Sequence, residues 1–241
     1  MTRKAVAKDF DDPDARALPA FPDVAHWSDE ARALYGDVRD VHPDVAARFE
    51  QLGIARVLDI GCGTGAFKRC FAGSWIGLDR SIQQLVHTDG PRTLADATLL
   101  PFGDATFDGA VALYVLNFFD EPRAVLREAA RVLRSGGAFA TCAPSRADCP
   151  ELRHVIPEEV FDDPFAAEDM EPVLGEIFED VELVTWDFPA FDFVDRGSVR
   201  DYLRAYAYPW LTLEEAARRA ESVDVPLKLT KRGAWGIGSK P

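Results

Sequence analysis

The chain has 241 residues, of which 47% are hydrophobic and 11% aromatic, enough to supply one core of the α/β type. Its formal net charge of −14 repels nucleic-acid backbones and anionic membranes, so neither is expected as a partner. The four cysteines form no C-x-x-C pair and have no histidine neighbours at zinc-ligand spacing, which predicts neither a metal site nor a disulfide framework.

The amino-terminal region lacks the apolar run of a signal peptide, and no 18-residue apolar stretch follows, so we expect a soluble, cytoplasmic protein. Residues 1–25, rich in Asp, Pro and Ala, are predicted to form a loosely held arm. Helices are expected at 28–34 and 43–52, with Ser28 as an N-cap and Pro43 in the first turn.

From residue 53 the chain alternates apolar strands with short helices or turns, which implies a doubly wound sheet with right-handed crossovers. The strands expected in this region are 56–60, 74–78, 92–95, 109–114 and 138–142. The clearest helix is 123–133, whose apolar residues share one face and which Ser135-Gly136-Gly137 is expected to end.

Beyond residue 144 this alternation stops. An acidic, proline-rich stretch predicts a loop, and the elements expected after it are a helix near 171–178, strands at 181–186 and 227–237, and helices at 198–206 and 213–222. The segment 188–226 between the last two strands is too long for a simple hairpin. Loops of this length at one end of an α/β sheet commonly carry binding function, so we expect the segment to shape a ligand site.

One segment joins an apolar strand directly to a glycine-rich turn and a short helix: Val57-Leu58-Asp59-Ile60-Gly61-Cys62-Gly63-Thr64-Gly65. Glycines in such a turn let the backbone pass close to a ligand and adopt angles that other residues avoid. This arrangement typically builds a nucleoside-cofactor site. Its G-x-G-x-G spacing, with Asp59 two positions before the first glycine, differs from the G-x-G-x-x-G of dinucleotide folds.

Acidic residues end the next two expected strands. Asp79 closes Ile76-Gly77-Leu78-Asp79, and a carboxylate at this point can accept both hydroxyls of a ribose. The structural alternative is a helix-capping Asp at the strand end. Asp96 closes the following strand and is followed by the apolar Leu100-Pro101-Phe102.

The order of these elements resembles that of the class I S-adenosylmethionine-dependent methyltransferases, in the branch that methylates small molecules. The likeness runs from about Val57 to Cys142 and includes the strings LADATLLPFGDATFDGAVALYVLNFF and EAARVLRSGG. It implies a Rossmann-like, doubly wound seven-stranded α/β sheet with the last strand antiparallel, with N-terminal helices and a helical insertion before the last strand. It also implies S-adenosyl-L-methionine as cofactor and S-adenosyl-L-homocysteine as product.

The resemblance assigns roles to residues. Asp96 would accept a hydrogen bond from the adenine amino group, Asp59 would fix the loop, and Leu113 with Tyr114 would flank the methionine part. Cys62 is expected to be inert packing rather than a nucleophile. Tyr35 with His26-Trp27 resembles the helices that close over the cofactor. The predicted cofactor-binding residues are Asp59, Gly61, Cys62, Gly63, Gly65, Asp79, Arg80, Asp96, Ala97 and Leu113.

The catalytic residues stay open at this stage. Methyl transfer from a sulfonium is an in-line displacement governed by alignment and exclusion of water, and a base helps only if the acceptor is protonated. Possible bases are the tyrosines of the late insertion and His26, His42, His87 and His154. Many relatives carry His after Leu116, where this chain has Asn117-Phe118, so a histidine base there is excluded.

Three residues are named as catalytic candidates: His154, Tyr202 and Asn117. Each has an ordinary structural alternative. His154 could be a solvated loop histidine, Tyr202 could pack beside Tyr206 on a helix, and Asn117 could cap a turn.

We therefore predict a methyltransferase acting on a small-molecule acceptor, a monomer or homodimer, in one domain over residues 1–241. Its expected parts are an arm with lid helices (1–52), a cofactor-binding core (53–143), and substrate-side loops with the insertion and last two strands (144–241). The alternatives are an NAD(P)-dependent oxidoreductase and a catalytically silent S-adenosylmethionine-binding scaffold. The acceptor, and whether O, N or C is methylated, do not follow from the sequence.

Overall fold

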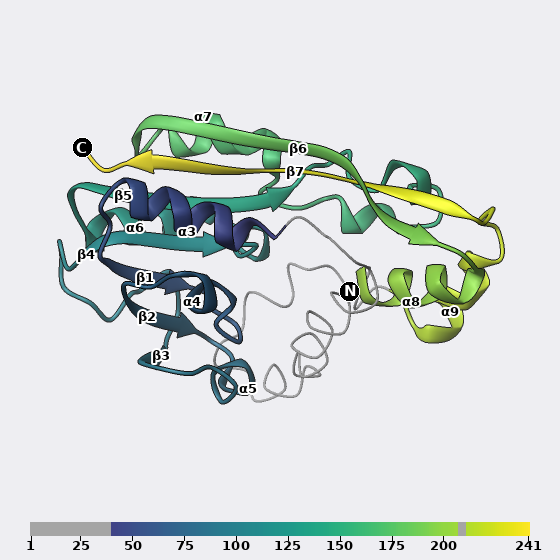
Figure 1. Cartoon of the computed structure of the whole chain (residues 1–241), viewed down its shortest axis with the longest axis horizontal. Coiled ribbons are helices and arrows are strands. Elements are labelled where there is room, and N and C mark those ends of the chain that lie inside the picture. The colour runs from purple at the N-terminus through teal and green to yellow at the C-terminus, as the bar shows by residue number, and fades with distance from the viewer. Residues whose placement is uncertain (1–39, 207–210) are drawn as a thin grey trace.

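The computed structural model describes residues 40–206 and 211–241, and its framework is a seven-stranded sheet (Figure 1). The predicted arm at 1–25, the helix at 28–34, and His26, Trp27 and Tyr35 lie outside the described residues. The strands are β1 (Arg56–Ile60), β2 (Ser74–Asp79), β3 (Arg92–Leu94), β4 (Phe107–Leu113), β5 (Leu133–Pro144), β6 (Glu179–Phe193) and β7 (Leu227–Ser239).

The strand order is β3-β2-β1-β4-β5-β7-β6, so β1 lies inside the sheet and the later strands are added on both sides of it. β1 to β5 pair in parallel, whereas β7 lies antiparallel between β5 and β6. The predicted doubly wound sheet with an antiparallel last strand is confirmed. The order reverses between β1 and β4, and ligands of open α/β sheets bind beyond the carboxyl ends of the strands at such a point.

Helices cover both faces of the sheet. They are α3 (Val41–Gln51), α4 (Ala66–Cys70), α5 (Ile82–Leu85), α6 (Pro122–Val132), α7 (Met170–Leu174), α8 (Arg196–Tyr206) and α9 (Leu213–Ala220), with 3-10 turns η2 (Leu116–Phe118), η3 (Pro150–Leu152), η4 (Glu158–Val160) and η5 (Ala167–Asp169). α6 starts with Pro122 in its first turn, where the missing N–H costs nothing, and it buries one apolar stripe. None of the described helices is long and apolar enough to cross a membrane.

The buried side chains form one apolar cluster on each face of the sheet and a third beyond it. On one face, α6 and α7 pack over β4 and β5, and Phe139 stacks on Phe178 with ring centroids 5.1 Å apart. On the other face, α3 and α4 pack over β1, β4 and β5, with Phe49 and Phe67 edge to face. The third cluster joins α8, α9 and the far part of the β6–β7 hairpin, which extends beyond the other strands in Figure 1.

The boundary between α6 and β5 differs from the prediction. The helix ends at Val132, and Ser135-Gly136-Gly137, expected to terminate it, lies within β5. Gly136 has φ +72°, and its N–H donates to the Lys240 carbonyl at 2.9 Å. The strand therefore starts early because it pairs with the carboxyl-terminal end of the chain, a contact that local glycine chemistry does not show.

β6 is also longer than the predicted 181–186. Its continuation to Phe193 pairs with Leu227–Lys231 of β7, so the connecting insertion starts at Val194 instead of Phe188. Pro189 sits at a register shift on this edge strand, the position where a residue without an N–H is tolerated. The helix predicted near 171–178 is shorter than expected, because α7 ends at Leu174. Phe178 lies beyond the helix, and its side chain is buried in the core.

Replacing Phe139 with Ala should lower the free energy of unfolding by about 3–5 kcal/mol, because the ring is fully buried and its removal leaves a cavity against Phe178. Urea unfolding measures the change. Leu213→Ala is the control, since that side chain is 58% exposed and its loss should cost no more than about 0.5 kcal/mol. Equal losses in the two variants would contradict this description of the core.

Candidate functional site

The glycine-rich loop connects β1 to α4 with three residues in left-handed backbone conformations: φ is +69° at Gly61, +53° at Gly63 and +80° at Gly65. A Cβ on Gly61 would lie 2.5 Å from a methyl carbon of Val115, so that position excludes a side chain. Among the described residues, the atom nearest to a Cβ on Gly63 would be the Gln84 amide oxygen, at 3.9 Å. The space in front of Gly63 is therefore open to a ligand, while its backbone angle still favours glycine.

Asp79, at the end of β2, holds this loop in place. Its Oδ2 accepts the Gly63 N–H at 2.9 Å, and its Oδ1 accepts the Ser81 N–H at 2.8 Å. Each carboxylate oxygen keeps a further lone pair, so the group can also accept hydroxyl hydrogens from a bound ribose. The alternative of Asp79 as a helix cap is wrong, because Ser81 is the N-cap of α5 and its hydroxyl accepts the Gln84 N–H at 3.3 Å.

Asp59 lies behind the loop, and its side chain is 4% exposed. Its Oδ2 accepts the indole N–H of Trp75 at 3.1 Å. Burial raises the pKa of Asp59 from 3.8 to about 7, with the Trp75 hydrogen bond opposing the shift and the Asp79 charge adding to it. Asp59 thus contacts the protein interior more than solvent, as expected for a residue that fixes the loop.

Cys62 also points away from solvent. Burial, with the neighbouring Asp59 and Asp79 carboxylates, raises the pKa of the Cys62 thiol far above its ordinary value. Because the thiolate is the nucleophilic form, this environment disfavours covalent chemistry at the sulfur. The carbonyl of Gly63 accepts a weak hydrogen bond from the thiol at 3.7 Å.

The turn after β3 presents a carboxylate beside apolar groups. Asp96 Oδ1 accepts hydrogen bonds from the Thr98 backbone N–H and hydroxyl, both at 2.7 Å. Ala97 is buried, whereas the Leu99 side chain is 76% exposed. An exposed apolar side chain near a hydrogen-bond acceptor suits a purine base with an amino group. Arg80, after Asp79, is exposed to solvent.

These residues come together because the carboxyl ends of β1, β2, β3 and β4 lie at one edge of the sheet (Figure 1). The open space at Gly63 and the acceptors at Asp79 and Asp96 fit an adenosyl nucleoside with a polar tail. Leu113, buried at the end of β4, lies at the same edge. The structure therefore gathers the cofactor-binding residues expected from the sequence; their binding roles stay predictions.

Tyr114 follows β4 with φ +58°, a conformation that costs a bulky residue about 1–3 kcal/mol. Its N–H donates to the Cys142 carbonyl at 3.2 Å, which ties the carboxyl ends of β4 and β5 together. Burial, with the nearby Cys142 and Asp40, raises the pKa of Tyr114 well above 10, although 38% of the residue is exposed. The phenol therefore stays protonated and can donate.

The three catalytic candidates lie on separate elements. Asn117, in η2, is 9% exposed, and within the described residues its Oδ1 has no hydrogen-bond partner. Tyr202, in α8, is 1% exposed, and its hydroxyl lies 3.0 Å from Cys149 Sγ and 3.3 Å from Lys231 Nζ. His154 is exposed in the turn after η3. The structure does not assemble them into one site, and a role for each stays a prediction.

One polar cluster had no signal in the sequence. Asp148 is fully buried, pairs with Lys231, and accepts the Tyr206 hydroxyl at 2.7 Å and the Arg232 N–H at 2.6 Å. Burial alone would lower the pKa of Lys231, but Cys149 and Asp148 raise it instead, so the ammonium is retained. The partners come from β7, α8 and the loop after β5, so no short-range pattern could have revealed the cluster.

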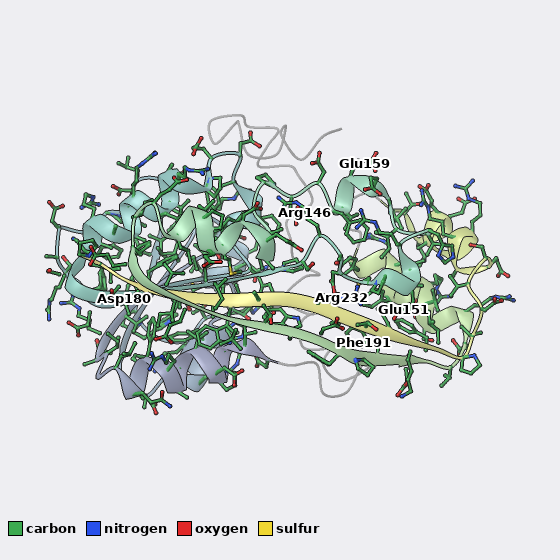
Figure 2. All side chains as sticks on the ribbon, turned by 90° about the horizontal axis from the view of Figure 1, so that it is seen from above. Arg146, Glu151, Glu159, Asp180, Phe191 and Arg232 are labelled. Carbon is green, nitrogen blue, oxygen red and sulfur yellow. The ribbon has the colours of Figure 1, made fainter. Side chains whose placement is uncertain are left out.

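A groove of about 240 Å³ opens beside Asp148 and is lined by Arg146 and Arg232, which Figure 2 labels, together with Arg153. Arg146 pairs with Asp169 at 2.6 Å and Arg232 with Asp187 at 3.0 Å, so these charges are compensated. The groove therefore shows no surplus charge for an anionic ligand.

Comparison with known proteins agrees with this geometry. Residues 58–141 match a family model described as a methyltransferase domain. The O-methyltransferase cnsE of Penicillium expansum is 29% identical over 65% of this chain and 64% of its own length. The demethylmenaquinone methyltransferase of Corynebacterium urealyticum is 37% identical over 43% of this chain and 47% of its own length. The chain thus spans less than two thirds of either relative.

Among solved structures, SpnF, described as a cyclase, is similar with a TM-score of 0.60 over 91% of this chain and 94% of that protein, at 17% identity. At this identity the likeness shows the fold alone. It supports the Rossmann-like architecture already seen in the strand order.

The burial of Asp59 predicts a pH effect on stability. The folded-state pKa of about 7 lies above the ordinary 3.8, so the folded chain holds the proton more tightly and loses stability as pH rises between these values. Asp59→Asn keeps an acceptor for Trp75 but carries no charge. Between about pH 4 and pH 8 the variant should therefore gain about 4 kcal/mol in the free energy of unfolding relative to wild type, measured by urea unfolding. If the free energies of unfolding of wild type and variant changed in parallel with pH, the raised pKa of Asp59 would be contradicted.

Proposed function

We propose, from the match of residues 58–141 to a methyltransferase domain and from the geometry of the glycine loop, that this chain transfers a methyl group from S-adenosyl-L-methionine to a small-molecule acceptor. The observation that carries the proposal is the contact between Asp79 and Gly63, which sets a carboxylate beside an open glycine loop at the switch point of the sheet. S-adenosyl-L-homocysteine is the expected product.

The residues divide into binding roles. Asp79 accepts the ribose hydroxyls, Asp96 accepts the adenine amino group with Ala97 and Leu99 beside the ring, and Arg80 borders the ribose from the solvent side. The loop backbone of Gly61, Cys62, Gly63 and Gly65 meets the amino acid tail, behind which Asp59 fixes the loop and Leu113 closes the end of β4.

When bound, the cofactor would supply an electrophilic methyl group on a sulfonium sulfur. The chain has to align that group with the acceptor and exclude water, because the leaving group is neutral. Two hydrogen bonds hold the strand ends around this site in place: the Gly63 N–H donates to the Asp79 carboxylate, and the Tyr114 N–H donates to the Cys142 carbonyl.

A small acceptor is supported by the names of the relatives. The protein of Corynebacterium urealyticum is named for demethylmenaquinone and that of Penicillium expansum for O-methylation. Because the chain covers only part of each, these acceptors are not transferred to it. The acidic charge of −14 further supports a partner other than nucleic acid.

A second candidate is a protein that binds the cofactor without transferring its methyl group. SpnF, with the same fold, is described as a cyclase, so the architecture by itself does not require methyl transfer. Turnover of radiolabelled methyl groups separates the two, because binding is common to both. The family match at 58–141 favours either over the nicotinamide-dependent oxidoreductase. Single-domain organisation, a cytoplasmic location and a monomeric or homodimeric state remain part of the proposal.

Asp79→Ala should weaken S-adenosylmethionine binding by about 1.5–3 kcal/mol, roughly ten- to a hundredfold in Kd, since the ribose hydroxyls lose an ionised acceptor. Isothermal titration calorimetry measures the change. Asp89→Ala is the matched control, because Asp89 is an exposed carboxylate in the turn before β3 and should leave Kd unchanged. Unaltered affinity in the Asp79 variant would show that the ribose lies elsewhere.

A further inference from the structure

A histidine and a carboxylate pair at the start of α3. The Nδ1 of His42 lies 2.5 Å from Asp40 Oδ1, which also accepts the His42 backbone N–H at 3.1 Å as the N-cap of the helix. When the ring donates from Nδ1, its Nε2 is left as a proton acceptor. The His42 side chain is 13% exposed, and within the described residues Nε2 has no hydrogen-bond partner.

The packing of α3 places this pair at the carboxyl edge of the sheet. Phe49, near the end of α3, packs where a Cβ on Gly109 would lie, at the start of β4. From Phe49 back to Asp40 the helix rises about 13 Å, and from Gly109 to Leu113 the strand rises about 13 Å. Figure 1 shows α3 along β5 with the start of the helix toward the end of that strand. The pair therefore lies level with the end of β4.

The pKa shifts at the carboxyl ends of β4 and β5 agree with the placement of the Asp40–His42 pair there. The Asp40 charge contributes to the raised pKa of Tyr114 and to that of Cys142, so Asp40 lies near the carboxyl ends of both β4 and β5. Tyr114 is the strained residue of this edge, with φ +58° and 38% of its side chain exposed. Such strain at the end of a central strand is found at functional sites.

A second, independent observation points to a ligand here. The indole N–H of Trp235 is buried, in a side chain only 6% exposed, and has no hydrogen-bond partner within the described residues. Trp235 pairs with Cys142 across β5 and β7 and belongs to the same apolar cluster as Val41, which adjoins both members of the pair. An unpaired buried donor is costly, and an oxygen of a bound molecule would satisfy it.

We propose that His42, positioned by Asp40, is the general base of the methyl transfer, and that the acceptor is a small aromatic molecule bearing an ionisable hydroxyl. The inference rests on the proposed methyltransferase function and names the acceptor class for that site. His42 is the catalytic residue, because its Nε2 meets the reacting hydroxyl. Asp40 is a positioning residue, since it acts through the imidazole.

The step balances without a further reagent. The acceptor hydroxyl gives its proton to Nε2 while its oxygen bonds to the methyl carbon, and the sulfonium sulfur keeps the electron pair of the broken bond. The imidazolium then returns its proton to water. Asp40 stabilises the charged ring during the transfer.

The aromatic class follows from the groups around the dyad. Tyr114, which is 38% exposed, offers aromatic surface just after the end of β4, and aromatic rings pack favourably on one another. The Trp235 indole is a donor without a partner among the described residues, which suits an acceptor with an oxygen substituent. An imidazole base suits aryl hydroxyls, whose acidity is closer to its own than that of alkyl alcohols.

The experiment measures transfer of tritiated methyl groups from S-adenosylmethionine to phenol, catechol, 4-nitrophenol and pentafluorophenol, in order of rising acidity. Wild type should methylate members of the series. His42→Ala should reduce kcat about 10²–10⁴-fold for weakly acidic phenols and progressively less for those already ionised at the assay pH. Added imidazole should restore part of the lost activity. His87→Ala, which removes an exposed histidine after α5, should behave as wild type.

Asp40 is tested by a variant that keeps the helix cap. Asp40→Ser retains an N-cap oxygen but removes the carboxylate from the imidazole. Nitrogen-15 NMR of the His42 ring should show mostly the Nδ1–H tautomer in wild type and a mixture in the variant. An unchanged tautomer would remove the positioning role of Asp40 and overturn this part of the proposal.

Three results would overturn the assignment of the base or the acceptor class: an undiminished kcat in His42→Ala, an equal loss across the whole acidity series, or no transfer by wild type to any hydroxyaryl compound. Calorimetry with S-adenosylmethionine separates these from failure of the proposed function. Cofactor binding without hydroxyaryl methylation contradicts the assignment of base and acceptor alone. Absence of cofactor binding contradicts that assignment and the proposed methyltransferase function.

Discussion

The hydrogen bond from the Gly63 N–H to the Asp79 carboxylate joins the two parts of the chain on which the candidate site depends. It ties the end of β2 to the loop after β1, and the parallel pairing of these strands keeps the two groups level. Three left-handed glycines let the loop turn under this contact without side chains in the ligand space. The buried Asp59–Trp75 hydrogen bond supports the loop from behind.

The far end of the molecule, beyond the parallel strands, is held together by different interactions. Its frame is the β6–β7 hairpin, which extends past the other strands and carries α8 and α9 at its far end (Figure 1). The buried pair Asp148–Lys231 connects β7 to the loop after β5, and Tyr206 connects α8 to the same carboxylate. A buried charge pair of this kind is sensitive to loss of either partner, so it favours one arrangement of three elements.

The helix α3 links the two halves. Its Phe49 end packs on the start of β4, and its Asp40 end reaches the carboxyl edge where Tyr114 and Cys142 meet. A bidentate contact of Arg48 with Glu182, at 2.7 and 2.9 Å, further ties this helix to β6. The position of His42 therefore depends on the packing of α3 against the sheet. The positions of Asp79 and the glycine loop depend instead on where β2 and β1 end.

The sequence by itself determined the positions of the core strands along the chain, the glycine loop and the acids at Asp79 and Asp96, because these features depend on local periodicity and on residues that follow strand ends directly. It did not determine the ends of α6 and β6, since Gly136 and the Phe188–Phe193 stretch are fixed by pairing with residues far along the chain. Nor did it single out His42 from the other histidines. Only the tertiary structure decided that Asp40 lies near Tyr114 and Cys142 and that Cys142 pairs with Trp235, because burial and cross-strand pairing bring together residues whose separation leaves no short-range pattern.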